Sequence, residues 1–502
     1  MIRLSGAGPI DLLPATSSSH YSIVADPIGS RVEIGDGADW VRIGGKVRAA
    51  AGIAVAQGTS NDHVDLEIQV TGGLYSTGSS ISLDSRDELV VAGEVVATGA
   101  NSEVTVHADH WLSVAGAVSA DKRVTITAGS VLADENSIET APGSSIRTTG
   151  STGEIVISGY NDVLINSAIG PDSTHLTLLS IGSLHGDVVL GEQGRLGPAD
   201  LIEFTGAVID VQRDIESAGT LRLHATELIK IHDATVVVTN TDARIELVSD
   251  GDILLGGAAI ADANHPSIPA GQRYQQGALI QAPAGVAITA ADALVINAAV
   301  QVASSGVGSR IDLTAPDMTV VGSLLAGASV DRLTGAVTWT GSASDVVFRA
   351  TNLLTFGGTG VDSATGGDAL RGGSAQATGT IDIGVHGGAA PISFAMNELS
   401  LMVADATGGG AFASPTAPSR VAIDVDGGLQ LAGTVSTVDS GSDIDLTAGG
   451  LVTISGILDA EDDLTILAGD DASGWSLLAS GLLNTGAGGT ISITAPAGVQ
   501  LG

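Results

Sequence analysis

The sequence predicts an all-β fold in which short strands stack coil upon coil as a parallel β-solenoid. Three observations favour it: alternating strands recur about every 22 residues, their apolar residues are mostly aliphatic, and Gly, Asp and Asn turns separate them. Hydrophobic residues make up 44% of the 502 residues, but aromatic residues make up only 3%. This composition suits a narrow aliphatic core. It disfavours tandem immunoglobulin-like sandwiches, which usually bury a large aromatic ring in each domain.

The repeat is clear between residues 81 and 130, where two alternating strands and the turn between them return 23 residues later. Equivalent positions are Ile81 and Val104, Leu89 and Leu112, Gly93 and Gly116, and Val95 and Val118. A glycine after the second strand indicates a corner that needs either a positive φ angle or a close backbone approach. We therefore expect equivalent strands to lie side by side in register.

The phrase from Ile444 to Ala448 shows why such strands must stack. Side chains alternate along a strand, so Ile444, Leu446 and Ala448 share one dry face, and the residues between them share a wet one. We expect Ile81, Val104, Leu446 and Ile466 to be buried, and Asp84, His107, Asp445 and Thr465 to be exposed. At ~4.8 Å per coil, a chain that coils throughout would form about 23 coils and a rod of roughly 110 Å.

Three segments interrupt the repeat and are predicted to project as loops. Pro266 and Pro269 argue against central strands in the first of them, the second is rich in Gly, and the third combines Gly, Ala and Pro. The predicted organisation is an irregular entry coil at 1–40, a β-solenoid over 41–260, a loop excursion at 261–284, and a continued β-solenoid over 285–502 with excursions near 357–379 and 404–420.

The phrase from Asp443 to Gly456 resembles the repeats of filamentous haemagglutinin-type adhesins and related giant bacterial exoproteins. The resemblance is one of repeat style and covers most of residues 41–502, with gaps at the loops. It implies a right-handed parallel β-helix, secretion to the bacterial surface, and a role in adhesion or surface architecture. The spacing of the repeats gives coils of about 20–22 residues. It also implies no enzyme activity, because the repeats of this family carry no catalytic residues. The family's N-terminal secretion module is not recognisable in this sequence.

Charge and composition narrow the range of partners. The chain has 56 acidic and 20 basic residues, a net charge of −36, and no basic run of the kind that nucleic acid requires. No apolar run approaches the ~18 residues of a membrane-spanning helix, so membrane insertion is not expected. The sequence has no Cys, which excludes disulfides and thiolate metal sites. Residues 490–502 continue the repeat, so we expect contacts with neighbouring segments of a longer chain or with further copies end to end. A host or matrix glycan or protein is a further expected partner.

One glycine-rich segment suggests a metal. Gly357–Asp362 matches the first six positions of the calcium-binding nonapeptide Gly-Gly-x-Gly-x-Asp, in which carboxylates and loop carbonyls supply oxygen ligands. The next unit contains Asp368 but breaks the pattern. Calcium held by Asp362 and Asp368 is therefore one hypothesis, and a plain glycine-rich loop is the other. No other cofactor is predicted.

The remaining ionisable clusters have a solvated strand face or turn as their simplest interpretation. They are His63 with Asp65 and Glu67, His107 with Asp109 and His110, the EF-hand-like Asp424 and Asp426, and the acidic turns at 461–463 and 470–471. The alternative function is a β-helical carbohydrate-active enzyme or a phage-type tailspike. It requires a groove with two carboxylates about 5–10 Å apart. Few aromatic and basic residues favour the non-catalytic interpretation.

Overall fold

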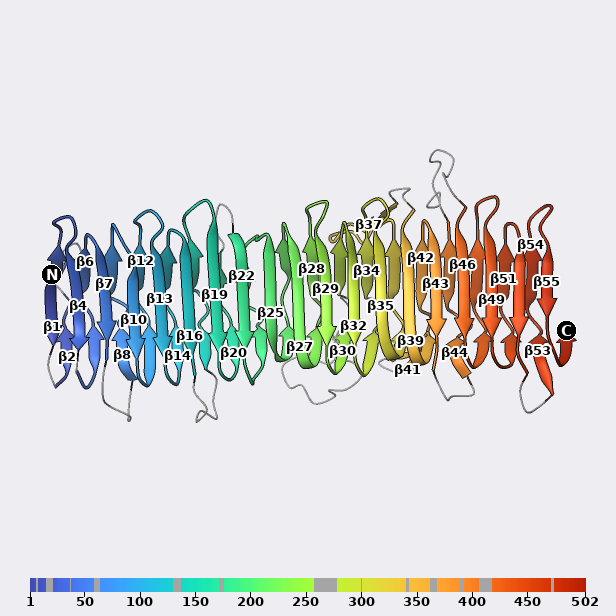
Figure 1. The fold of residues 1–502 in the computed structure, drawn as a ribbon, viewed down its shortest axis with the longest axis horizontal. Coiled ribbons are helices and arrows are strands. Elements are labelled where there is room, and N and C mark those ends of the chain that lie inside the picture. The colour runs from blue at the N-terminus through green and yellow to red at the C-terminus, as the bar shows by residue number, and fades with distance from the viewer. Residues whose placement is uncertain are drawn as a thin grey trace. The chain divides into compact units, whose positions relative to one another are not determined.

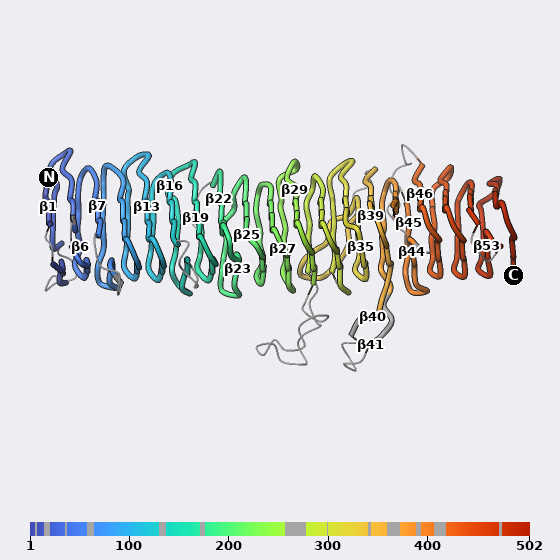
Figure 2. The backbone as a smooth tube through the Cα atoms, turned by 60° about the horizontal axis from the view of Figure 1, so that its bottom comes forward, coloured from blue at the N-terminus to red at the C-terminus, as the bar shows by residue number. Residues whose placement is uncertain are grey.

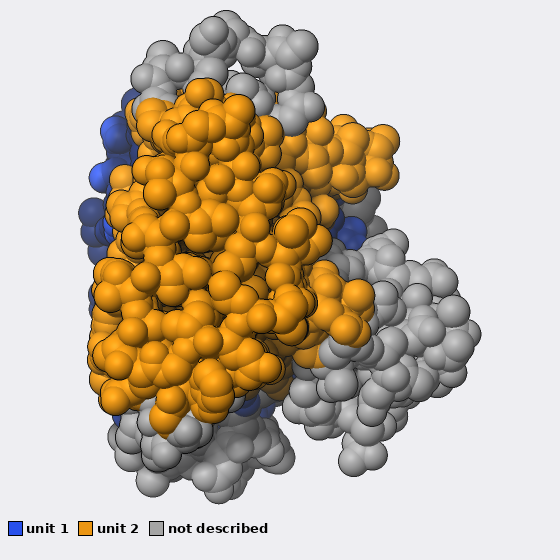
Figure 3. All heavy atoms as spheres, turned by 90° about the vertical axis from the view of Figure 1, so that its right-hand side faces the viewer, with its two compact units in different colours: residues 1–226 blue, residues 227–502 orange. Residues whose placement is uncertain are grey.

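The computed structural model of the protein describes residues 1–5, 8–14, 21–36, 38–57, 64–129, 137–170, 176–256, 278–298, 300–339, 343–361, 368–387, 392–405, 418–470 and 474–502. These residues form strands and turns, which confirms the all-β prediction. Among them there is no helix that is long and apolar enough to cross a membrane. The chain divides into two compact units, Met1–Thr226 and Glu227–Gly502 (Figure 3).

In unit 1 each coil contributes a first, a second and a third strand, and equivalent strands form three stacks (Figure 1). The first stack contains β1 (Ile2–Ser5), β4 (Arg31–Asp36), β7 (Gly52–Ala56), β10 (Ile81–Ser85), β13 (Glu103–Ala108), β16 (Arg123–Ala128), β19 (Gly153–Gly159) and β22 (Leu176–Ser183). The second contains β2 (Ile10–Leu12), β5 (Val41–Ile43), β8 (Val64–Ile68), β11 (Glu88–Val91), β14 (Leu112–Val114), β17 (Ile138–Thr140), β20 (Val163–Ile165) and β23 (Val188–Leu190).

The third stack of unit 1 is a parallel sheet of eight strands. It contains β3 (Ile23–Ala25), β6 (Lys46–Ala49), β9 (Gly73–Ser76), β12 (Glu94–Ala97), β15 (Ala117–Ala120), β18 (Ser145–Thr148), β21 (Ala168–Ile169) and β24 (Arg195–Leu196). β25 (Leu201–Val211) is long enough to pair with both β22 and β23. β26 (Ile215–Ser217) and β27 (Thr220–Ile231) follow, and the boundary between the units falls within β27.

Unit 2 repeats the three-strand coil. Its first stack contains β29 (Arg244–Ser249), β32 (Gly285–Ala290), β35 (Arg310–Val320), β39 (Asp345–Phe356), β43 (Thr380–Val385), β46 (Arg420–Val425), β49 (Asp443–Ala448), β52 (Leu464–Ala468) and β55 (Ile491–Thr494). The second contains β30 (Asp252–Leu255), β33 (Ala293–Ile296), β44 (Ile392–Met396), β47 (Gly428–Leu431), β50 (Val452–Ile454), β53 (Trp475–Ala479) and β56 (Gly498–Leu501), together with the later halves of β35 and β39.

The third stack of unit 2 contains β28 (Thr235–Val238), β31 (Leu279–Ala282), β34 (Gln301–Ser304), β36 (Ser323–Ala326), β42 (Ser374–Ala377), β45 (Leu401–Ala404), β48 (Thr434–Thr437), β51 (Ile457–Ala460) and β54 (Leu482–Thr485). Two antiparallel hairpins interrupt the coils: β37 (Ala328–Val330) with β38 (Val337–Trp339), and β40 (Gly358–Val361) with β41 (Asp368–Arg371). Figure 2 shows β40 and β41 projecting away from the neighbouring coils.

The strand register is the one that the repeat predicts. Ile81 pairs with Val104 and Leu89 with Leu112, both in parallel strands, and Val95 pairs with Val118 in the same way. The residues that point inward from the three stacks form the core, so each strand alternates between buried and exposed positions. Parallel strands in stacked sheets with a shared core are a β-solenoid-like arrangement.

The predicted core residues are buried. Ile81, Val104, Leu446 and Ile466 have no exposed surface. Of the four predicted exposed residues, Asp84 is exposed. His107, Asp445 and Thr465 point outward but are half-buried, because side chains of the adjacent coils flank them. Isolated strands would leave this face open, whereas stacking at ~4.8 Å covers part of it.

The core contains more buried aromatic rings than its aliphatic composition predicts. The largest fully buried side chains are Phe204 in unit 1 and Phe348, Phe356 and Phe394 in unit 2. The rings of Phe348 and Phe356 are 5.3 Å apart, and those of Phe356 and Phe394 are 6.1 Å apart, in edge-to-face geometry. Unit 2 therefore contains a short aromatic column within its aliphatic core.

The corner glycines are required by close approach and not by a positive φ angle. A Cβ atom on Gly116 would overlap the carbonyl oxygen of Gly93 in the preceding coil. In unit 2 a Cβ on Gly456 would overlap the carbonyl oxygen of Gly433, and one on Gly481 that of Gly456. None of these glycines has a positive φ angle. Each unit thus contains a glycine column where the backbone turns from the second strand into the third.

Several predicted boundaries need correction. Residues 1–40, predicted as an irregular entry coil, contain β1 to β4, and β1, β2 and β3 already pair in register with the next coil. The segment 261–284 includes β31, and 357–379 includes a hairpin and the coil strand β42. Residues 406–417 of the third excursion lie outside the described residues. The hairpin of β37 and β38 is an excursion that the sequence analysis missed, because its residues alternate like a coil strand.

Candidate functional site

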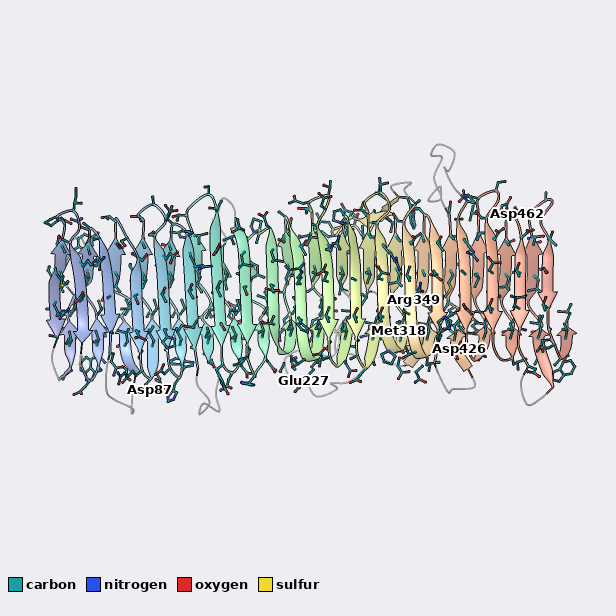
Figure 4. All side chains as sticks on the ribbon, in the orientation of Figure 1. Asp87, Glu227, Met318, Arg349, Asp426 and Asp462 are labelled. Carbon is teal, nitrogen blue, oxygen red and sulfur yellow. The ribbon has the colours of Figure 1, made fainter. Side chains whose placement is uncertain are left out.

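The corner between the first and second strands of a coil, here called the first corner, holds two of the ionisable clusters singled out in the sequence, one in each unit. In unit 1, His107 is the last outward residue of β13, and Asp109 and His110 follow it in the corner. Asp87 occupies the same corner one coil earlier, at the edge of the stack (Figure 4). The coil-to-coil register brings His110 next to Asp87, although 23 residues separate them in the chain.

Two hydrogen bonds join Asp87 and His110. The backbone N–H of His110 donates to the carbonyl oxygen of Asp87 at 3.1 Å, and His110 Nδ1 is hydrogen-bonded to Asp87 Oδ1. The Asp87 side chain is 10% exposed and the His110 side chain is 42% exposed. A carboxylate that accepts from Nδ1 fixes the imidazole tautomer and its orientation. The pair is a corner contact between coils with one buried and one open member.

A second histidine lies beside this pair. His107 Nδ1 is 2.9 Å from the Thr127 hydroxyl of the following coil, and His107 Nε2 is 3.0 Å from Asp109 Oδ1. The structure therefore brings His107, Asp109 and His110 into one corner, as the sequence suggested, and adds Asp87 and Thr127. These two residues come from neighbouring coils, so the register and not the local motif reveals them.

Unit 2 has a related first corner built around His386, which follows β43. His386 Nδ1 is 3.2 Å from Asp426 Oδ1, and His386 Nε2 is 4.0 Å from Asp424 Oδ2. Asp426 Oδ2 also accepts a hydrogen bond from the backbone N–H of Gly387 at 2.7 Å. The Gly387 N–H and the His386 side chain both favour the charged carboxylate, so they lower the pKa of Asp426.

An arginine completes this cluster. Arg349, Gly384 and Asp424 are in register on β39, β43 and β46, and the His386 ring lies over the gap that Gly384 leaves. Arg349 pairs with Asp382 at 2.5 Å. Figure 4 labels Arg349 and Asp426 within unit 2. The cluster combines a cation, an imidazole and three carboxylates, all of them at the surface.

The outer face of the first stack carries further ion pairs between coils. In unit 1 they include Arg3 with Glu33 and Arg123 with Glu154, and in unit 2 they include Arg420 with Asp445. Exposed pairs of this kind contribute about 0–1 kcal/mol each, since water and salt screen them. They specify register between coils more than they stabilise the fold.

The metal hypotheses gain no support from geometry. Within the described ranges, no group of three or more His, Asp or Glu side chains could hold a metal ion. Asp362 lies outside the described residues. The backbone of Asp368 begins β41 and pairs antiparallel with Val361. Calcium at Asp362 and Asp368 therefore stays a prediction.

The acidic turns make structural hydrogen bonds between coils. Asp443 Oδ1 accepts from the backbone N–H of Asp463 at 3.1 Å, and Asp463 Oδ1 accepts from that of Thr490 at 2.8 Å. In unit 1, Asp162 Oδ1 accepts from the N–H of Asp187 at 2.8 Å in the same way. These carboxylates satisfy backbone donors at the points where strands begin. Part of the acidity thus has a structural role in linking one coil to the next.

In the cluster predicted at His63, Asp65 and Glu67, the two acidic residues have different surroundings. His63 lies outside the described residues, and Glu67 forms an ion pair with Arg42 at 2.8 Å. Asp65, expected on an exposed polar face, is 1% exposed. The cluster is therefore not a shared surface site.

Comparison with known proteins adds no relative: the chain matches no family model, no curated protein and no solved structure. The function is argued from this geometry.

Proposed function

We propose that the chain is a structural or adhesive segment of an extracellular or cell-surface bacterial fibre, without catalytic activity. We further propose that its coils form a right-handed parallel β-helix with about 20–22 residues per coil. The observation that carries the proposal is the three-strand coil repeated through each unit around a mostly aliphatic core. Such coils stabilise one another through nearest-neighbour contacts, so the architecture gains length without a larger core.

The role of the ionisable residues supports a scaffold. Asp87 with His110, Asp443 with the N–H of Asp463, and Arg420 with Asp445 each link one coil to the next. These hydrogen bonds and ion pairs keep the strands of neighbouring coils in register. In this proposal, adhesion belongs to the excursions, which leave the repeats unchanged. The hairpin of β40 and β41 is one such excursion (Figure 2).

Two experiments test the proposal. Negative-stain electron microscopy of the purified chain should show an elongated particle, and a compact globular particle would contradict it. Incubation with polyuronides and other acidic glycans should give no turnover. Steady release of unsaturated sugars, lost in His110→Ala or His386→Ala, would instead establish the alternative of a carbohydrate-active enzyme.

A further inference from the structure

The outer face of the third stack in unit 1 carries a compact group of aromatic and charged side chains on and beside β3, β6, β9 and β12 (Figure 1). The strand register places Arg48 beside Tyr75, and it puts Lys46 and Glu94 on either side of Gly73. With one residue before β3 and one after it, they form what is here called the tyrosine cluster: Tyr21, Asp26, Lys46, Arg48, Tyr75 and Glu94. Three steps of ~4.8 Å between strands make the cluster about 14 Å across, the scale of a short oligosaccharide.

The Tyr75 ring is held in one position. A Cβ atom on Gly73 would lie 2.7 Å from Cε2 and Oη of Tyr75, so the ring lies along its own strand in the space that this glycine leaves. The Tyr75 hydroxyl donates to the Glu94 carboxylate, and the Tyr21 ring meets the Tyr75 ring edge to face, with 5.6 Å between their centroids. Burial, and then the hydrogen bond to Glu94, raise the pKa of Tyr75, so its hydroxyl stays a donor. Because the ring is only half-buried, its exposed part is a preorganised platform.

Charged side chains frame the two rings. The Arg48 guanidinium lies over the Tyr21 ring, 4.8 Å from its centroid, and pairs with Asp26 at 2.8 and 2.5 Å. Lys46 Nζ lies 5.9 Å from the centroid of the Tyr75 ring. With the Glu94 carboxylate, the frame holds two cations and two carboxylates. The tyrosine cluster is therefore locally neutral in a chain whose net charge is −36.

We propose that the tyrosine cluster binds an uncharged glycan, whose sugar rings stack on the tyrosines and whose hydroxyl groups bond to the charged side chains. A sugar hydroxyl both donates and accepts hydrogen bonds, so it suits a frame that offers ammonium and guanidinium donors next to carboxylate acceptors. The rings supply the apolar contact that the carbon face of a sugar needs.

Other classes of ligand fit the tyrosine cluster less well. An acidic glycan would meet two carboxylates and the net charge of −36, and a cationic ligand would meet Lys46 and Arg48. A peptide strand would find no open edge to extend, because β6 and β9 are each paired on both sides. An uncharged ligand with many hydroxyl groups is the one that leaves no charge opposed.

This inference goes beyond the proposed fibre segment, which places adhesion on the excursions, because it gives the coils themselves a ligand. Isothermal titration calorimetry with cellohexaose and chitohexaose should show that at least one of them binds, with a Kd of about 0.1–1 mM. The affinity should change little between about 0.1 M and about 1 M salt, since an uncharged ligand has no charge to screen. Hexagalacturonate, an acidic oligosaccharide of the same length, should bind about tenfold more weakly or not at all.

Variants locate the site. Tyr75→Ala should weaken binding about tenfold or more, because it removes the platform. Tyr75→Phe keeps the ring and loses only the hydrogen bond to Glu94, so it should weaken binding about threefold. The control Trp111→Ala removes a half-buried aromatic ring at a first corner of the same unit, and it should leave the affinity unchanged. Circular dichroism melting of each variant would confirm that it folds.

Three results would overturn the inference: no binding of either uncharged hexaose up to about 5 mM, equal losses for Tyr75→Ala and Trp111→Ala, or tighter, salt-sensitive binding of hexagalacturonate. The outcome is separate from that of the fibre proposal. An elongated particle that binds no hexaose would overturn this inference alone, and a compact particle that binds one would contradict the fibre segment alone.

Discussion

The first corner of each unit contains a His–Asp pair that links two coils, and the two pairs differ in how far the carboxylate is buried. In unit 1, Asp87 pairs with His110 of the next coil, and in unit 2, His386 pairs with Asp426 of the next coil. The Asp87 side chain is 10% exposed, whereas that of Asp426 is 55% exposed. The register of a repeat therefore places a His–Asp pair at a corner, and burial decides how much that pair stabilises.

The largest expected effect comes from the glycine columns, which test whether both units share one corner geometry. Gly116→Ala in unit 1 and Gly456→Ala in unit 2 each place a Cβ on a carbonyl oxygen of the preceding coil. Because backbone must move to relieve the overlap, each should lower the free energy of unfolding by about 1–3 kcal/mol or more in urea titrations. Gly8→Ala is the control, since its Cβ meets nothing within 4 Å. Equal stability of all three variants would refute the close-approach account.

The two His–Asp pairs should differ in their contribution to stability. Asp87→Ala removes a buried acceptor and should cost about 1 kcal/mol of unfolding free energy. Asp426→Ala should cost less, because water can replace a carboxylate that is already exposed. Urea titration of the two variants measures the difference. A larger loss for Asp426→Ala would show that the exposed corner of unit 2 is the more important one.

A pH titration tests how the Asp426 carboxylate in unit 2 contributes to stability. Hydrogen bonds from Gly387 and His386 lower the pKa of Asp426 below its ordinary value of 3.8. The contribution to stability is therefore fully present above the unfolded pKa, and it is lost as the pH falls through the lower folded pKa. The Tm difference between the wild type and Asp426→Asn should be present at neutral pH and should shrink below about pH 4. A difference that grows with acidity would contradict this assignment.

Much of the fold could be predicted because the residue offset between repeats gives the strand register directly. The 23-residue offset places Ile81 beside Val104, and alternation places both in the core. The hairpin of β37 and β38 escaped prediction for a related reason. Its Ala328 and Val330 alternate as a coil strand does, and only the third-stack face they cover distinguishes them.

The candidate site could be predicted only in part. His107, Asp109 and His110 are close in sequence, so their grouping was visible. The place of Asp87 beside His110 could not be predicted, since this contact depends on how two corners of different coils align. The burial of Asp65 is likewise not apparent from alternation, which places it on an outward face. Asp65 lies in β8 at the point where its register with β11 shifts, so strict alternation fails there.

The smallest expected effect comes from two nearly identical surface ion pairs, one in each unit. Arg3 donates through Nε and an Nη atom to one Glu33 oxygen at 2.9 and 2.7 Å, and Arg420 does the same to Asp445 at 2.8 and 2.7 Å. Exposures also match, at 54% and 29% for the first pair and 54% and 31% for the second. Double-mutant cycles with alanine should give couplings of about 0.2–1 kcal/mol for both. Both should fall between 0.1 M and 1 M salt, as the Debye length shortens from about 10 Å to about 3 Å. Because geometry and exposure are the same, unequal couplings would mean that the surrounding charge of each unit, and not the pair itself, sets the energy.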